Sequence, residues 1–212
     1  MSFYDLIVQG GPVMWPLLGL SIITLACALE RGWFWYQLLS REDQIAHEVL
    51  AAAQVDLSSS AAIASQAQDL PIGRFLLAPL KLRQPTPETF RLAMEAAGDK
   101  EFVKMRRGEK LLETIVAISP LLGLLGTVTG LIATFSSLQI GSTTGTDATK
   151  AAAGIGEALI TTATGMVVAI LALIFFRLFI TLQAQQVDYF SEVGSELELI
   201  YRQVWYEPKQ DQ

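Results

Sequence analysis

The sequence is poor in the residues that build disulfide frameworks, metal sites and nucleic-acid interfaces. Its 212 residues include one cysteine, Cys27, and one histidine, His47. Neither an intrachain disulfide nor a His and Cys ligand cluster can form from these, and we expect no metal and no cofactor. Only 17% of the residues are charged, and the net charge of −6 lacks the basic excess that neutralises phosphates, which argues against nucleic-acid binding.

Residue patterns typical of enzymes are also missing. His47 lies in a charged segment without Cys or His neighbours, and we expect it to be a solvated surface residue. No Ser-His-Asp set can be assembled within the apolar segments, and no phosphate-binding Gly-Lys loop occurs. The sequence therefore predicts that the protein is not an enzyme.

What the sequence has instead is hydrophobic residues, which make up 51% of it and gather in three runs. Leu6 to Leu29 and Thr114 to Thr146 carry no charge, and Ala151 to Phe176 carries only Glu157. About 20 helical residues cross a hydrocarbon core of about 30 Å, so the runs predict transmembrane helices at 12–36, 113–139 and 151–177. The first 30 residues lack the Lys or Arg that opens a signal peptide, so we expect the first helix to be retained.

The basic residues predict how the chain is oriented. No Lys or Arg precedes the first run and Lys150 alone lies between the second and third, while the other fourteen lie on the opposite side. Because Lys and Arg are retained in the cytoplasm, residues 1–11 and 140–150 are expected to be periplasmic. Residues 37–112 and the tail 178–212 are then cytoplasmic, in a multi-pass protein of the inner membrane.

The long loop at 37–112 reads as helical. Segments at 42–53, 57–67 and 71–82 are separated by Ser-rich or Pro-containing breaks, and Thr86-Pro87-Glu88 resembles a helix start. That last helix is expected to run straight into span two, with a kink at Pro120, where a backbone donor is missing. Ten basic and ten acidic residues in the loop predict solvated helix faces rather than a binding patch.

Span three is expected to continue into the tail as an amphipathic helix. Apolar residues recur there at spacings of three and four, at Val187, Phe190, Val193, Leu197, Ile200 and Val204. We expect this stripe to pack against the loop helices or a neighbouring subunit. The predicted fold is an all-α integral membrane protein with three transmembrane helices, of which spans two and three extend as long cytoplasmic helices.

Small and hydroxyl-bearing residues line one face of spans two and three. In span two they are Gly123, Thr127, Gly130, Thr134 and Ser137, and in span three Gly154, Ala158, Thr162, Gly165, Ala169 and Ala172. Residue physics alone favours close helix packing, because small residues let backbones approach. The alternative is a pore shared between copies, in which Thr127 and Thr162 supply hydroxyls to an otherwise apolar lumen.

Glu157 is the only acid within span three and is a functional candidate, because a carboxylate near the membrane is costly. On a helix it lies about 90° from the centre of the span-three line, so it flanks the line. A proton relay, a structural hydrogen bond to Thr161 or the facing helix, and simple hydration near the outer end all remain open.

Two motifs resemble the ExbB/TolQ proton-channel family: SPLLGLLGTVTG at 119–130 and GIGEALITTATG at 154–165. The three-span layout is similar to that family over nearly the whole chain. The resemblance implies a ring-forming subunit, a homopentamer that encloses a single-span partner of the ExbD/TolR type. That partner carries a protonatable aspartate. It also implies that Thr127 and Thr162 occupy the family's pore-threonine positions, and Glu157 that of its span-three glutamate.

The implied activity is coupling of the proton motive force to work at the outer membrane, such as import of nutrients or iron complexes, with a TonB/TolA-type protein as a further possible partner. Membrane lipid surrounds the spans. A TolQ-type subunit for envelope maintenance and a scaffold without ion flux are the alternatives.

Overall fold

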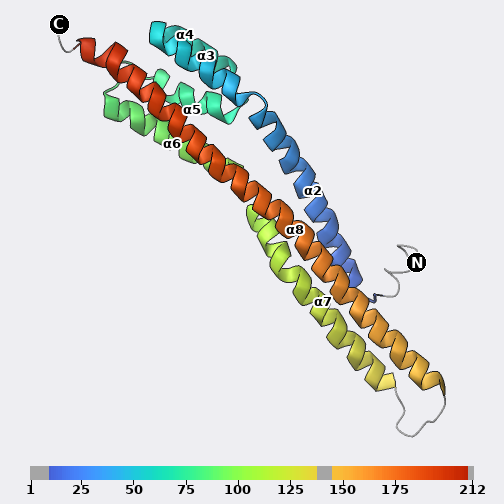
Figure 1. The fold of residues 1–212 in the computed structure, drawn as a ribbon. Coiled ribbons are helices and arrows are strands. Elements are labelled where there is room, and N and C mark those ends of the chain that lie inside the picture. Colours follow the sequence, from blue (N-terminus) through green and yellow to red (C-terminus); the bar gives the residue numbers. More distant parts are fainter. Residues whose placement is uncertain (1–9, 138–144, 210–212) are drawn as a thin grey trace. The chain divides into compact units, whose positions relative to one another are not determined.

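The computed structural model describes residues 10–137 and 145–209, and every element among them is helical (Figure 1). The helices are α2 (Met14–Leu39), α3 (Glu42–Val55), α4 (Leu57–Gln66), α5 (Pro71–Leu80), α6 (Pro87–Met105), α7 (Glu109–Ser137) and α8 (Gly145–Ile200). They form two compact units. We call Met1–Glu30 with Gly108–Leu178 the membrane unit, and Arg31–Arg107 with Phe179–Gln212 the head unit.

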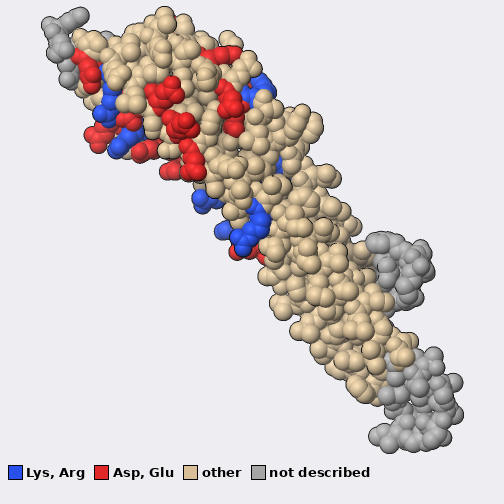
Figure 2. All heavy atoms as spheres, viewed as in Figure 1, with Lys and Arg blue, Asp and Glu red and all other residues tan. Residues whose placement is uncertain are grey.

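Three helices, α2, α7 and α8, are long and apolar enough to cross a membrane, in agreement with the predicted number of spans. In the membrane unit, Val13 and the first turn of α2, with Met14 and Leu17, pack against Leu122 of α7 and Ile160 of α8. Large apolar side chains point outward from α7 and α8 along this unit. Figure 2 shows charged side chains gathered over the head unit, while the apolar length of the membrane unit is bare of them on the face drawn.

Helix α8 runs unbroken from Gly145 to Ile200 and contributes to both units, as the tail periodicity predicts. The expectation of one uninterrupted helix from Pro87 through span two is wrong, because α6 ends at Met105 and α7 begins at Glu109. Gly108 lies between them at φ 90°, a left-handed conformation that ends a helix. The Arg31 guanidinium donates to the carbonyls of Met105 (3.4 Å) and Arg107 (3.2 Å), which stabilises the break.

The short helices of the head unit begin where local residues favour a helix start. Thr86 caps α6 by accepting from the Thr89 amide at 3.2 Å, and Pro87 takes the first helical position, as predicted. The three loop helices α3, α4 and α5 match the predicted segments to within two residues. Asp56 separates α3 from α4, because its carboxylate accepts from the amides of Ser58 and Ser59.

The apolar stripe of α8 packs in the head unit. Of its six residues, Phe190, Val193, Leu197 and Ile200 are buried. Phe190 lies 4.8 Å from Phe75 and 5.3 Å from Phe102 between ring centroids. A Cβ on Gly194 would stand 2.9 Å from the Phe75 ring, which explains a glycine inside this helix. Packing against the loop helices is therefore the role that the structure gives to the stripe.

Acidic residues of the head unit are less solvated than their balanced charge predicts. Glu101 is 3% exposed at its side chain and is held by Arg74 at 2.6 Å and Lys104 at 2.7 Å. Glu42 is 5% exposed. The prediction of solvated faces is wrong at these two positions, because each carboxylate has a partner from a residue distant in sequence or one turn away.

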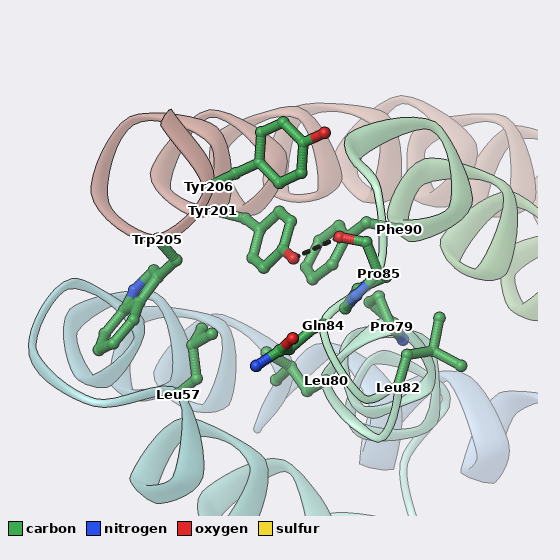
Figure 3. Close-up of a pocket in the computed structure, with 10 residues that line it drawn as sticks. All are labelled: Leu57, Pro79, Leu80, Leu82, Gln84, Pro85, Phe90, Tyr201, Trp205 and Tyr206. Carbon is green, nitrogen blue, oxygen red and sulfur yellow. Dashed lines mark hydrogen bonds between the residues drawn. The ribbon is translucent and has the colours of Figure 1, made fainter. Parts of the chain in front are cut away.

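Within the head unit, aromatic side chains of the segment that follows α8 line a pocket of about 280 Å³ (Figure 3). After α8 a π-helical segment, Tyr201–Tyr206, places the Tyr201 ring 4.3 Å from Phe90 in a stacked pair. The Tyr201 hydroxyl donates to the carbonyl of Pro85, and Trp205 Nε1 donates to the carbonyl of Ala53 at 2.7 Å.

Candidate functional site in the α7 and α8 helix pair

The contact between α7 and α8 depends on glycines of α7. A Cβ on Gly123 would lie 3.0 Å from Thr162 Cα, and one on Gly126 would lie 2.7 Å from Thr161 Cβ. At Gly130 it would lie 3.3 Å from the Ala158 methyl group. Every one of these distances is shorter than an ordinary carbon contact, so the backbone of α7 approaches α8 as closely as only glycine allows.

Glycines of α8 complete the contact from the other side. A Cβ on Gly165 would meet the Ser119 carbonyl oxygen at 2.5 Å, and one on Gly154 would collide with the Thr134 hydroxyl. Ala158 and Ala169, at 3% and 8% exposed, are buried in the same chain.

Most of the predicted pore-lining set therefore takes part in contacts within one subunit or is buried there. These residues are Gly123, Gly130, Thr134, Ala158, Gly165 and Ala169. The close packing that residue physics favours describes them in the single chain. That any of them also faces a pore stays a prediction.

The two threonines singled out by the sequence are both half-buried, and each hydroxyl donates to a backbone carbonyl, as the buried Thr134 hydroxyl also does. Thr162 Oγ1 donates across the helix pair to the Gly123 carbonyl at 2.9 Å, and Thr127 Oγ1 donates to the Leu124 carbonyl at 2.7 Å. In an α-helix the carbonyl of Gly123 is also the acceptor of the Thr127 amide. The two hydroxyls thus bond to the carbonyls of adjacent residues of α7, Gly123 and Leu124.

This hydrogen bonding fixes what the hydroxyls can do chemically. A threonine hydroxyl has one donor and two acceptor lone pairs, and here the donor is already used by a backbone carbonyl. The oxygens of Thr127 and Thr162 are left as acceptors for a donor such as water or a protonated carboxyl group.

Pro120 lies inside α7, whose helix continues on both sides of it. Its missing amide leaves the carbonyl of Val116 without the usual helical donor. The neighbouring Ser119 is fully buried and its hydroxyl donates to the Ile115 carbonyl at 2.7 Å, while its own carbonyl faces Gly165. The Ser-Pro pair therefore belongs to the helix contact, and the kink at Pro120 stays a prediction.

Two other predicted residues have different outcomes. The side chain of Glu157 lies outside the described residues, so its three possible roles stay open. His47 is exposed, as predicted, and the described residues contain no cluster of His, Cys, Asp or Glu that could hold a metal ion.

Sequence reasoning missed Thr161 as a packing residue. It is 1% exposed, its hydroxyl donates to the Ala158 carbonyl at 3.0 Å, and its side chain fills the space over Gly126. The signal was present in the spacing, since Thr161 follows Ala158 by three residues and Gly154 by seven.

Comparison with known proteins identifies this helix pair. Residues 67–192 match the model of the MotA/TolQ/ExbB proton channel family, and this range includes α7 and most of α8. A Synechocystis protein named as the biopolymer transport protein ExbB-like 1 is 66% identical over 207 residues, 97% of this chain and 82% of the relative.

Two further relatives resemble the chain at lower identity. A second Synechocystis protein, named ExbB-like 3, is 39% identical over 203 residues, covering 96% of this chain and 97% of its own length. The Tol-Pal system protein TolQ of Haemophilus influenzae is 33% identical over 114 residues, 53% of this chain and 49% of TolQ. The family match spans more than half of the chain, and the full-length similarity to ExbB-like proteins agrees with it. The chain therefore belongs to the MotA/TolQ/ExbB proton channel family, as a transport subunit rather than an enzyme.

Proposed function

We propose that the chain is the proton-channel subunit of an inner-membrane complex that couples the proton motive force to work at the outer membrane. In this proposal the head unit is cytoplasmic and the N-terminus periplasmic. The basic residues support that orientation, because fourteen of the fifteen lie in the head unit or close to its ends in the sequence. The exception is Lys150, between the second and third apolar runs.

The observation that carries the proposal is the hydrogen bonding of the two threonines, Thr162 to the Gly123 carbonyl and Thr127 to the Leu124 carbonyl. With their donors engaged, both hydroxyl oxygens are fixed acceptors at the edge of the helix pair. A protonated carboxyl group of a partner can donate to them, whereas a carboxylate cannot. The threonines then stabilise the neutral carrier as it passes through the apolar region, where a bare charge is costly.

A partner is needed, because the described parts of α7 and α8 bring no acid into this contact. We propose a homopentamer that surrounds a single-span protein of the ExbD/TolR type, whose carboxylate is the proton carrier. Outward-facing apolar side chains such as Leu121, Phe135 and Leu159, at 63%, 70% and 64% exposed, give α7 and α8 surfaces suited to lipid and to neighbouring copies. Each proton that crosses 100 mV supplies about 2.3 kcal/mol for movement of the partner.

Among the members of this family, ExbB-type transport through a TonB-like protein is our first choice. The relatives that cover nearly the whole chain are named ExbB-like, whereas the TolQ relative covers about half of it. A TolQ-type role with a TolA-like protein is the alternative. A scaffold without ion flux is the third possibility, which flux measurements separate from both.

The test is proton uptake by liposomes that contain the chain together with the single-span protein that co-purifies with it. Thr162→Val keeps the side-chain volume but cannot hydrogen-bond, and Thr162→Ser keeps the hydroxyl. We expect uptake to fall by about tenfold or more in the valine variant, the factor that 1.4 kcal/mol represents, and to be largely kept in the serine variant.

Thr129→Val is the matched control, because Thr129 lies on α7, is exposed, and donates only to carbonyls of its own helix. We expect it to leave uptake unchanged. Equal uptake in wild type and Thr162→Val would remove Thr162 from the proton path. Absence of uptake in the wild-type complex, with the partner present, would favour the scaffold.

A further inference from the structure

An acid is buried in the head unit, where the function proposed above gives it no role. Glu42 is the first residue of α3 and is 5% exposed, and it faces Gln186 of α8, which is 2% exposed. Gln186 Nε2 donates to Glu42 Oε1 at 2.7 Å, joining residues 144 positions apart in sequence. The other oxygen of each group, Glu42 Oε2 and Gln186 Oε1, is buried and finds no donor among the described residues.

What these two oxygens lack is a hydrogen-bond donor. An ionised carboxylate only accepts hydrogen bonds, and an amide oxygen does the same. Turning the Gln186 amide over would not help, because its oxygen would then face a carboxylate oxygen. A proton on the carboxyl group does help, since it turns one oxygen into a donor and allows a second bond between the same two side chains.

We propose that Glu42 is a proton-binding site of the head unit, holding its proton on Oε2 toward Gln186 Oε1 and linking α3 to α8 in the protonated state.

The surrounding charges favour the neutral acid. A cavity of about 540 Å³ lies between α3 and α8 and is lined by Asp43, the neighbour of Glu42. Its titratable lining residues are Asp43, His47, Tyr189, Glu192 and Glu196. Of these, Asp43 is the carboxylate whose negative charge opposes ionisation of Glu42.

The adjacent cation, Arg41, forms an ion pair with Asp69 at 2.8 Å. Two features of the local structure favour a charged Glu42, the positive end of the α3 dipole and the hydrogen bond from Gln186. Burial outweighs both and, with a smaller contribution from Asp43, raises the pKa of Glu42 to about 7.

Protonation near neutral pH would make the contact between α3 and α8 sensitive to the pH around the head unit. Loss of the proton leaves a buried charge to which no cation of the described residues contributes, which weakens the Glu42–Gln186 contact. A hydrogen bond between Tyr189 of α8 and Asp43 of α3 is a second contact between the same two helices. Burial and the nearby acids raise the pKa of Tyr189. That tyrosine therefore stays protonated while Glu42 titrates. The proposal does not rest on proton flux through the membrane unit.

The experiment is an infrared titration of the full chain in detergent micelles between pH 5 and 9. A protonated carboxylic acid absorbs separately from a carboxylate. We expect one protonated acid to persist at pH 6 and to titrate with a midpoint near pH 7, as the raised pKa of Glu42 implies. Glu42→Gln removes this band, whereas Glu48→Gln, an exposed position on the same helix, leaves it in place.

A second measurement keeps the test independent of how the variants fold. In wild-type chain labelled with carboxyl ¹³C glutamate, one resonance is expected to titrate near pH 7, well above the ordinary glutamate value of 4.5. The proposal is overturned if every glutamate is ionised at pH 6, or if the late-titrating group survives in folded Glu42→Gln protein.

Discussion

Replacing Gly165 with alanine tests whether the small residues of the membrane unit are packing contacts. The added methyl group would meet the Ser119 carbonyl oxygen at 2.5 Å and Gly123 Cα at 3.1 Å. Both obstacles are backbone atoms, so neither can rotate away. Gly156 is the matched control on the same helix, because a Cβ there meets nothing within 4 Å.

The expected magnitudes follow from two opposing effects. Alanine in place of glycine favours a helix by about 0.5–1 kcal/mol, and this gain applies at both positions. At Gly165 it is opposed by overpacking, which costs about 1–3 kcal/mol and falls in the upper part of that range when backbone must move. Gly156→Ala is therefore expected to stabilise the chain slightly, and Gly165→Ala to destabilise it by about 1–2 kcal/mol.

The assay is thermal unfolding in detergent, followed by tryptophan fluorescence. For a chain of this length each kcal/mol shifts Tm by about 2–4 °C, so the two variants should differ by about 3–12 °C. Equal melting temperatures would refute the packing argument. If Gly165→Ala kept full stability but lost proton uptake, Gly165 would face an open lumen instead.

Two further predictions concern the head unit. Thr86→Ala removes the side chain that caps α6 and should lower the free energy of unfolding by about 1 kcal/mol. Thr89→Ala is the control, because it keeps the backbone amide that Thr86 binds and so should keep the cap. Urea titration of both variants measures the difference. Because folding raises the pKa of Glu42 from 4.5 to about 7, the folded state binds this proton more tightly than the unfolded chain. Stability should therefore fall as pH rises from 5 to 7 and level off above, by up to about 3 kcal/mol. Glu42→Gln should flatten the profile, and Glu101, whose pKa is lowered, stays ionised over this range. An unchanged slope in that variant would assign the pH dependence to another group.

Local sequence patterns predicted the helices whose starts and faces depend on neighbouring residues. Thr86 and Pro87 act within one turn, and the α8 stripe repeats every three or four residues, so both were legible in the sequence. The break between α6 and α7 was not predicted. Gly108 is a local signal for it that sequence reasoning missed, whereas the bonds from Arg31 to carbonyls 74 and 76 residues further along the chain are contacts that a local pattern cannot reveal.

The same distinction applies to the buried acids. Glu42 occupies the first turn of α3, where an acid is common and usually solvated. Its burial depends on Gln186 of α8, a residue that carries no signal of its own in the sequence. Helical periodicity can identify which residues share a face, but it cannot identify the helix that covers that face.

For the membrane unit this limit bears directly on how a pore could be built. The faces of α7 and α8 that carry Gly123, Gly126 and Gly165 are occupied by each other within one chain. A lumen between copies must then use the edges of the pair, where side chains remain partly exposed. Thr127 and Thr162 are at such edges, and their hydroxyl donors are engaged by carbonyls before any partner arrives. Acceptors oriented in advance cost no reorganisation when a protonated carboxyl group reaches them, which is what the proposed proton path requires of these two threonines.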